Sequence, residues 1–197
     1  MSGSNLFVTS FSGNTIGEYT TSGGTVNASL VSGLNGADGL ALSGSNLFVT
    51  NANGNTIGEY TTSGGTVNAS LVSGLGFPDG ITVSGSDLFV TNASGNTIGE
   101  YTTSGGTVNA NLITGLVEPF RIAVFGSDLF VGSPNDTIGE YTTSGGTVNA
   151  SLVSLSPAPA GIVVTGVPEP ASVSLLGAAA VGLLARRHKP LKMPCPQ

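Results

Sequence analysis

The chain has 197 residues, of which 31 are glycine; 39% are hydrophobic, 8% are charged and none is tryptophan. This length allows one domain or a short array of repeats, and the low charge argues against an intrinsically disordered chain. The net charge is −6, and four of the five Lys and Arg residues lie in the last twelve positions. The rest of the chain carries one base, Arg121, so it lacks the cationic surface that nucleic-acid binding requires.

The N-terminus enters a strand pattern almost at once, at residues 6–9. An exported protein is expected to begin with a basic segment followed by an apolar one. Residues 1–5 contain neither, so we expect the sequence to be incomplete at its front, without its leader or without further repeats.

A repeat organises most of the chain. The string TIGEYTTSGGTVNA occurs four times, with its tyrosine at Tyr19, Tyr60, Tyr101 and Tyr141. The spacings are therefore 41, 41 and 40 residues, from 60 − 19, 101 − 60 and 141 − 101. A period of this length indicates stacked units that bury one another's faces.

Each unit contains four short segments of strand character. In the second unit these are residues 40–42, 47–50, 56–61 and 67–72. The unbroken apolar run at 47–49 predicts burial on both faces, and Asn53-Gly54-Asn55 is typical of a hairpin turn. Alternation in the fourth segment predicts that Val67, Ala69 and Leu71 share one face.

Four strands in about 40 residues is typical of a β-propeller blade, so we expect an all-β fold. The first unit has no innermost strand before it, whereas residues 161–165 form an unpaired one at the end of the array. Adding that segment to residues 5–31 would complete a blade and close a four-bladed propeller. A truncated larger ring, a ring shared by two chains and a β-solenoid are the alternatives.

The repeats resemble the NHL family of propellers over residues 1–166. The residues that carry this resemblance are Pro78-Asp79-Gly80-Ile81, then Asp87-Leu88-Phe89-Val90, then Asn96-Thr97-Ile98. That family alternates a Pro-x-Gly-Ile strand, a Gly-Asn-Leu-Tyr-Val strand and an Asn-x-Ile strand. The resemblance implies a propeller domain that comprises residues 1–166.

The C-terminal segment has a different character. Val167, Pro168, Glu169 and Pro170 precede fifteen uncharged residues at 171–185, and Arg186-Arg187-His188-Lys189 follows. The prolines end the sheet domain, and the apolar stretch would form a transmembrane helix of about 22 Å, with the basic cluster on the cytoplasmic side. Residues 190–197 are expected to be a disordered tail.

This order of elements at 167–189 is similar to the PEP-CTERM sorting signal, also described as an ice-binding protein C-terminal domain. The resemblance implies that an exosortase recognises Pro168-Glu169-Pro170 and releases or transfers the protein at the bacterial surface. The family usually ends just after the arginines, whereas this chain continues to Gln197. A plain C-terminal membrane anchor is the alternative.

We find no catalytic constellation or cofactor motif in residues 1–166. The only histidine, His188, belongs to the basic cluster, and the only cysteine, Cys195, lies near the C-terminus. One glutamate recurs in each unit, but four carboxylates spread around a ring cannot converge on one ion; these are Glu18, Glu59, Glu100 and Glu140.

Asp38, Asp79 and Arg121 are the candidates for a binding site. The two aspartates stand at the entry to the innermost strand, where loops crowd the central channel of a propeller. The equivalent positions in the other units are Phe120, with Arg121 beside it, and Ala160. Such a mouth could hold a small polar ligand or a cation, although Asp-Gly is also an ordinary turn pair.

Together these features predict an exported, non-enzymatic surface or matrix protein whose propeller binds exopolysaccharide or a surface protein. The rival prediction is a propeller hydrolase of the lactonase type, with a metal at Asp38 and Asp79. A minor alternative is an ice-binding surface formed by the repeated Thr61-Thr62 pairs. We expect membrane contact through the C-terminal helix before processing.

Overall fold

The computed structural model describes residues 5–164, which contain fifteen β-strands in four antiparallel sheets. The first sheet comprises β1 (Asn5–Ser10), β2 (Thr15–Thr20) and β3 (Thr25–Ser32). The second comprises β4 (Ala37–Ser43), β5 (Asn46–Asn51), β6 (Thr56–Thr61) and β7 (Thr66–Ser73). The third comprises β8 (Pro78–Ser84), β9 (Asp87–Asn92), β10 (Thr97–Thr102) and β11 (Thr107–Ile113). The fourth comprises β12 (Arg121–Phe125), β13 (Asp128–Ser133), β14 (Thr137–Thr142) and β15 (Thr147–Ser154).

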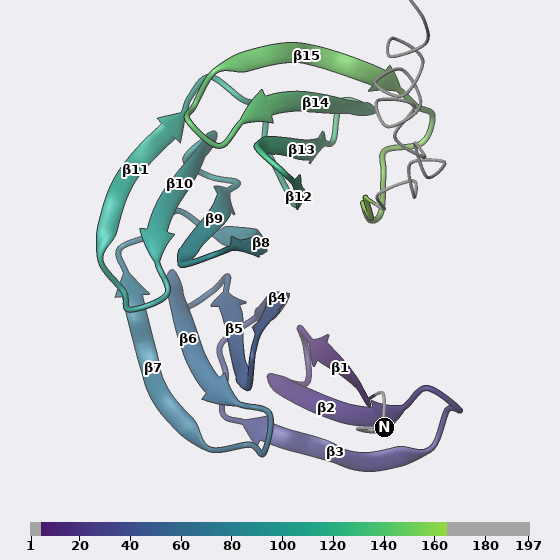
Figure 1. The fold of residues 1–197 in the computed structure, drawn as a ribbon. Coiled ribbons are helices and arrows are strands. Elements are labelled where there is room, and N and C mark those ends of the chain that lie inside the picture. The colour runs from purple at the N-terminus through teal and green to yellow at the C-terminus, as the bar shows by residue number, and fades with distance from the viewer. Residues whose placement is uncertain (1–4, 165–197) are drawn as a thin grey trace, which may run out of the picture. The chain divides into compact units, whose positions relative to one another are not determined.

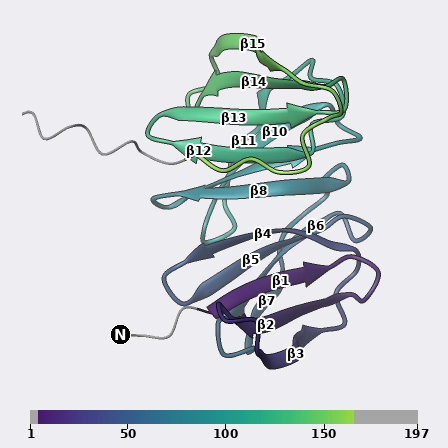
Figure 2. The same ribbon diagram turned by 90° about the vertical axis from the view of Figure 1, so that its right-hand side faces the viewer.

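The sheets follow one another along an open arc, with each sheet's strands ordered from the inside outward (Figure 1). The innermost strands β4, β8 and β12 lie side by side towards the centre, and β3, β7, β11 and β15 form the rim (Figures 1 and 2). The arrangement is that of propeller blades. The predicted all-β fold is confirmed for residues 5–164.

The core lies between successive sheets. Leu47, Phe48 and Val49 of β5 are at most 1% exposed, as the apolar run predicted. The two sides of β5 face different neighbours: Leu47 and Val49 pack towards the first sheet, and Phe48 packs towards the third. Burial on both faces explains why this strand shows no polar alternation.

The hairpin turn predicted at residues 53–55 is also present. Asn55 has a φ of 54°, which asparagine tolerates better than most residues. Its side-chain oxygen accepts a hydrogen bond from the Phe77 backbone N–H at 2.9 Å, and its carbonyl accepts one from Leu75 at 3.1 Å. The turn of one blade therefore holds the connection to the next.

The rim strand β7 buries Val72, a residue outside the alternating set Val67, Ala69 and Leu71. Val67 is 53% exposed and Ala69 is exposed, whereas Val72 is buried. The reason is a break in register, because Ile57 pairs with Val72 while the residue two positions later pairs with Asn68. The extra residues of β7 form a bulge, and a bulge resets which side chains face inward.

The unpaired strand expected at 161–165 is not formed within the described residues. Residues 161–164 contain no strand, and the first sheet remains three-stranded. The segment lies beside the fourth sheet instead, since Ala160, Gly161 and Ile162 line a cavity together with Arg121 of β12. It therefore does not complete the blade of β1.

Several predicted features lie outside the described residues. They are the sorting segment 167–189 with its apolar helix at 171–185, the tail at 190–197, and His188 and Cys195. Within residues 5–164, no helix is long and apolar enough to cross a membrane.

Candidate functional site

Threonine hydroxyls tie the innermost strands together at the centre of the arc. The Thr50 hydroxyl accepts a hydrogen bond from the Gly39 N–H at 2.8 Å and donates one to the Asp79 carbonyl at 2.6 Å. Thr9 donates in the same way to the Asp38 carbonyl, also at 2.6 Å. Each threonine thus fixes the backbone of an aspartate in the following blade.

The glycines after the aspartates allow this close approach. A Cβ atom on Gly80 would lie 2.8 Å from the Phe120 carbonyl oxygen and 3.1 Å from the Ile122 nitrogen, closer than side chains tolerate. In the fourth sheet, Arg121 occupies the position that Gly39 and Gly80 hold in their sheets. At this position the fourth sheet therefore has a long cationic side chain, where the second and third sheets have only the hydrogen atom of a glycine.

The Arg121 side chain reaches back across the inner strands to both aspartates. Its Nη1 forms ion pairs with Asp38 Oδ1 at 3.3 Å and with Asp79 Oδ1. Its Nε donates to the Ala160 carbonyl at 3.2 Å, and its Cζ lies 5.5 Å from the centre of the Phe120 ring. The structure therefore brings the three predicted site residues together.

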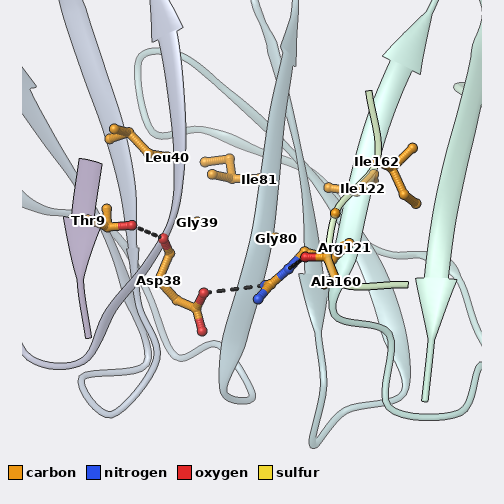
Figure 3. A pocket seen from close by; sticks show the side chains of 11 residues that line it. Thr9, Asp38, Gly39, Leu40, Gly80, Ile81, Arg121, Ile122, Ala160 and Ile162 are labelled. Carbon is orange, nitrogen blue, oxygen red and sulfur yellow. Dashed lines mark hydrogen bonds and ion pairs between the residues drawn. The ribbon is translucent and has the colours of Figure 1, made fainter. Parts of the chain in front are cut away.

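Asp38 and Arg121 border a cavity of about 370 Å³ on the inner strands (Figure 3). Asp79 does not line this cavity but is joined to it through its ion pair with Arg121. Figure 3 shows Asp38 and Arg121 facing each other across it, joined by the ion pair. The rest of the lining is mostly small or aliphatic, and includes Thr9, Ile81, Ile122, Ala160 and Ile162. Its exposed surface is nevertheless more polar than apolar, since Ile81 and Ile122 are themselves buried, and such a surface suits a polar ligand.

The two carboxylates have different environments. Burial raises the pKa of Asp79 from its ordinary 3.8 to about 6, and the charge of Asp38 raises that pKa as well. The Arg121 charge and hydrogen bond lower the pKa of Asp79, but by less. The side chain of Asp79 is 13% exposed and that of Asp38 is 23% exposed, which is consistent with the larger desolvation of Asp79.

This arrangement presents both donors and acceptors to a ligand. Arg121 carries five N–H donors, and each aspartate retains an oxygen that does not bind Arg121. Within residues 5–164, no group of three or more His, Cys, Asp or Glu side chains is placed to hold a metal ion. The residues present suit hydrogen bonding to a polar molecule.

The recurring glutamates do not belong to this cavity. Glu59 accepts a hydrogen bond from Asn46 Nδ2 at 2.7 Å within its own sheet, and Glu18 pairs with Asn5 in the same way.

Sequence reasoning missed the role of Thr9 and Thr50 in fixing the aspartates. An alignment of the repeats could have indicated Arg121, because it stands at the position where the second and third units have the glycine of their Asp-Gly pair.

Comparison with protein families identifies the C-terminal segment. Residues 166–189 match the family described as the PEP-CTERM protein-sorting motif. The chain carries a PEP-CTERM sorting signal. This signal indicates export and C-terminal sorting to the cell surface, and it implies processing by an exosortase. No curated protein sequence matches the chain significantly.

Solved structures resemble the repeats. A streptogramin B lyase is 26% identical with a TM-score of 0.62, and the match covers 77% of this chain and 52% of that one. A catalytically inactive virginiamycin B lyase from Staphylococcus aureus, with quinupristin, is 27% identical with a TM-score of 0.64, covering 82% and 57%. The nidogen/laminin complex matches at 21% identity and a TM-score of 0.63, covering 80% and 64%.

These likenesses support β-propeller-like repeats ahead of the PEP-CTERM signal. The chain spans about half the length of the two lyases that it matches. The nidogen/laminin match is below 25% identity and bears on the fold alone.

Proposed function

We propose that this PEP-CTERM chain is a non-catalytic binding module of the bacterial cell surface or extracellular matrix. The exosortase would release or transfer it after export, and the β-propeller region would then bind exopolysaccharide or a surface protein. The observation that carries this proposal is the cluster of ion pairs between Arg121 and the two aspartates, Asp38 and Asp79, of which Asp38 and Arg121 line one cavity.

A hydroxyl-rich ligand suits this cavity. Sugar hydroxyls both donate and accept hydrogen bonds, so they match carboxylate oxygens beside guanidinium N–H groups. The aliphatic lining from Ile81, Ile122 and Ile162 would contact the C–H faces of a sugar ring. Exopolysaccharide is therefore the preferred ligand, with a surface protein second.

The four sheets belong to a propeller ring in this proposal. The open arc of sheets supports a larger ring of which residues 5–164 form part (Figure 1). The coverage of only 52% and 57% of the two lyases also favours a larger ring over a closed four-bladed one.

The competing function is enzymatic, and the 26–27% identity to two lyases favours testing it. A lactonase-type hydrolase would bind a metal through Asp38 and Asp79. The non-catalytic proposal is preferred because Arg121 already pairs with both carboxylates and its positive charge would repel a cation.

Isothermal titration calorimetry separates the two functions. The exopolysaccharide of the bacterium of origin should bind the wild-type protein. The Asp38→Ala/Asp79→Ala variant should bind it at least about tenfold more weakly, because it loses the carboxylate of Asp38 in the cavity and the ion pair by which Asp79 holds Arg121. Asp87→Asn is the control, since this carboxylate neither lines the cavity nor pairs with Arg121. Equal polysaccharide binding by all three proteins would refute the site. Calcium or zinc binding that the double variant abolishes would instead support the enzyme.

A further inference from the structure

The first sheet leaves uncovered an apolar face that every other sheet buries. We define the head face as Leu6, Val8 and Tyr19. Leu6 is 49% exposed and Val8 is 50% exposed. Their counterparts in the second sheet, Leu47 and Val49, are fully buried, and so are Leu88 and Val90 in the third.

The fourth sheet leaves the complementary face uncovered. We define the tail face as Ile138, Leu152 and Val153. Val153 is 38% exposed, whereas its counterparts Val31, Val72 and Ile113 are 5–6% exposed. Leu152 is 41% exposed.

These two kinds of face already pack against each other three times within the chain. Ile16 and Val31 of the first sheet cluster with Leu47, Val49 and Tyr60 of the second. The same set of positions forms the cluster between the second and third sheets and the cluster between the third and fourth. The head face and the tail face are thus the two halves of one interface, left at opposite ends of the arc (Figure 1).

The segment after the fourth sheet would add backbone pairing to this contact. Residues 161–164 follow the last sheet at the point where each preceding unit begins its innermost strand, and Val163 is 86% exposed. The first sheet has no such strand, so β1 has an unpaired inner edge. In the second sheet Leu40 pairs with Val49, and the equivalent pair here is Ile162 with Val8. An exposed segment and an open edge in matching register are suited to strand addition.

We propose that the head face binds the tail face of a second copy of this chain, head to tail, and that residues 161–164 of one copy complete the β1–β2–β3 sheet of the other. The occupant is a second copy because the tail face is the surface that packs on the head-face positions at each contact between successive sheets. Within residues 5–164 the chain does not fill its own first sheet, which remains three-stranded. A contact between two different faces produces a closed ring or a longer head-to-tail assembly, depending on its rotation.

Analytical ultracentrifugation of the full chain in detergent micelles tests the proposal. Wild type is expected to associate, and Val8→Asp or Val153→Asp should raise the dissociation constant about 100-fold, because each would bury an unpaired carboxylate in an apolar contact. Val67→Asp is the matched control, since Val67 is equally exposed but lies on the rim strand β7. Mixing the Val8→Asp and Val153→Asp variants should restore association, because the mixture retains one intact pair of faces. A monomeric wild type, association unchanged by both variants, or loss of association in Val67→Asp would overturn the proposal.

A disulfide distinguishes a second copy from closure within one chain. In a Cys195→Ser background, Val8→Cys combined with Ile162→Cys should give covalently linked dimers or longer chains under oxidising conditions. Monomers with an internal disulfide would show closure within the chain and refute the second copy. Circular dichroism and thermal unfolding of each variant establish that the sheets are intact.

Discussion

The raised pKa of Asp79 predicts how the stability of the fold depends on pH. Its pKa of about 6, against an ordinary 3.8, means that the folded state disfavours its ionised form. The difference of about 2.2 units, at 1.36 kcal/mol per unit, corresponds to about 3 kcal/mol. A carboxyl group whose pKa is raised by folding binds protons more tightly in the folded state. This contribution therefore destabilises the fold fully above about pH 6 and disappears as the pH falls below about 4.

Asp79→Asn removes this charge while keeping the shape of the side chain. The variant should be more stable than wild type by about 1 to 3 kcal/mol at pH 8 and should lose most of that advantage at pH 4. The lower bound allows for the ion pair between Asp79 and Arg121 that the variant loses. Arg121 keeps its ion pair with Asp38 at 3.3 Å. Urea denaturation of both proteins between pH 4 and pH 8 measures the difference.

Two further variants test the causes of the shift. Asp38→Asn removes a like charge, so the pKa of Asp79 should fall below about 6, whereas Arg121→Gln removes the stabilising cation, so that pKa should rise. Carboxyl ¹³C NMR titration reads these values directly. A pKa of Asp79 near 3.8 in wild type, or equal stability of Asp79→Asn and wild type from pH 4 to pH 8, would show that folding does not disfavour the ionised form of Asp79.

Two other predictions concern the contacts between and within blades. Thr50→Val should lower the free energy of unfolding, measured by urea denaturation, by about 1 to 3 kcal/mol, because the Gly39 N–H loses its acceptor. Thr50→Ser keeps the hydroxyl and should lower it by less. Equal losses in the two variants would show that the hydrogen bond does not stabilise the fold. Burial and the charge of Asp87 raise the pKa of Glu100, so ionisation of Glu100 weakens the fold as the pH rises. Asp87→Asn should therefore stabilise the protein at pH 7 by a few tenths of a kcal/mol to about 1 kcal/mol, and by less at pH 4. In the second sheet the equivalent residue is Asn46, which donates a hydrogen bond to Glu59. A loss of stability of Asp87→Asn at pH 7 would contradict this prediction.

The strands and turns could be predicted because local chemistry determines them. The apolar run at Leu47–Val49 has no polar alternation because sheets cover both of its sides, and the sequence shows this directly. Asn55 marks its turn because few residues tolerate a positive φ at that position. The gathering of Asp38 and Asp79 also follows from the repeat, since equivalent positions in adjacent blades are neighbours.

Other features depend on contacts that a single repeat does not encode. The bulge in β7 places Val72 inward, and nothing in the alternation of Val67, Ala69 and Leu71 indicates that break in register. The failure of residues 161–164 to pair with β1 depends on the spacing between the ends of the arc, which accumulates over four sheets. The reach of Arg121 to both aspartates likewise depends on how closely three innermost strands approach one another.

The PEP-CTERM signal is expected to deliver a β-propeller-like module to the cell surface. The direct test is fractionation of the bacterium of origin, with the chain expressed from its own gene and detected by an antibody against the repeats. Wild type is predicted on the surface or in the medium. A variant with alanines at Pro168, Glu169 and Pro170 is predicted to stay in the cytoplasmic membrane, and Pro190→Ala, outside the matched motif, should behave as wild type. Surface delivery of the triple variant at the wild-type level would show that Pro168, Glu169 and Pro170 are not needed for sorting.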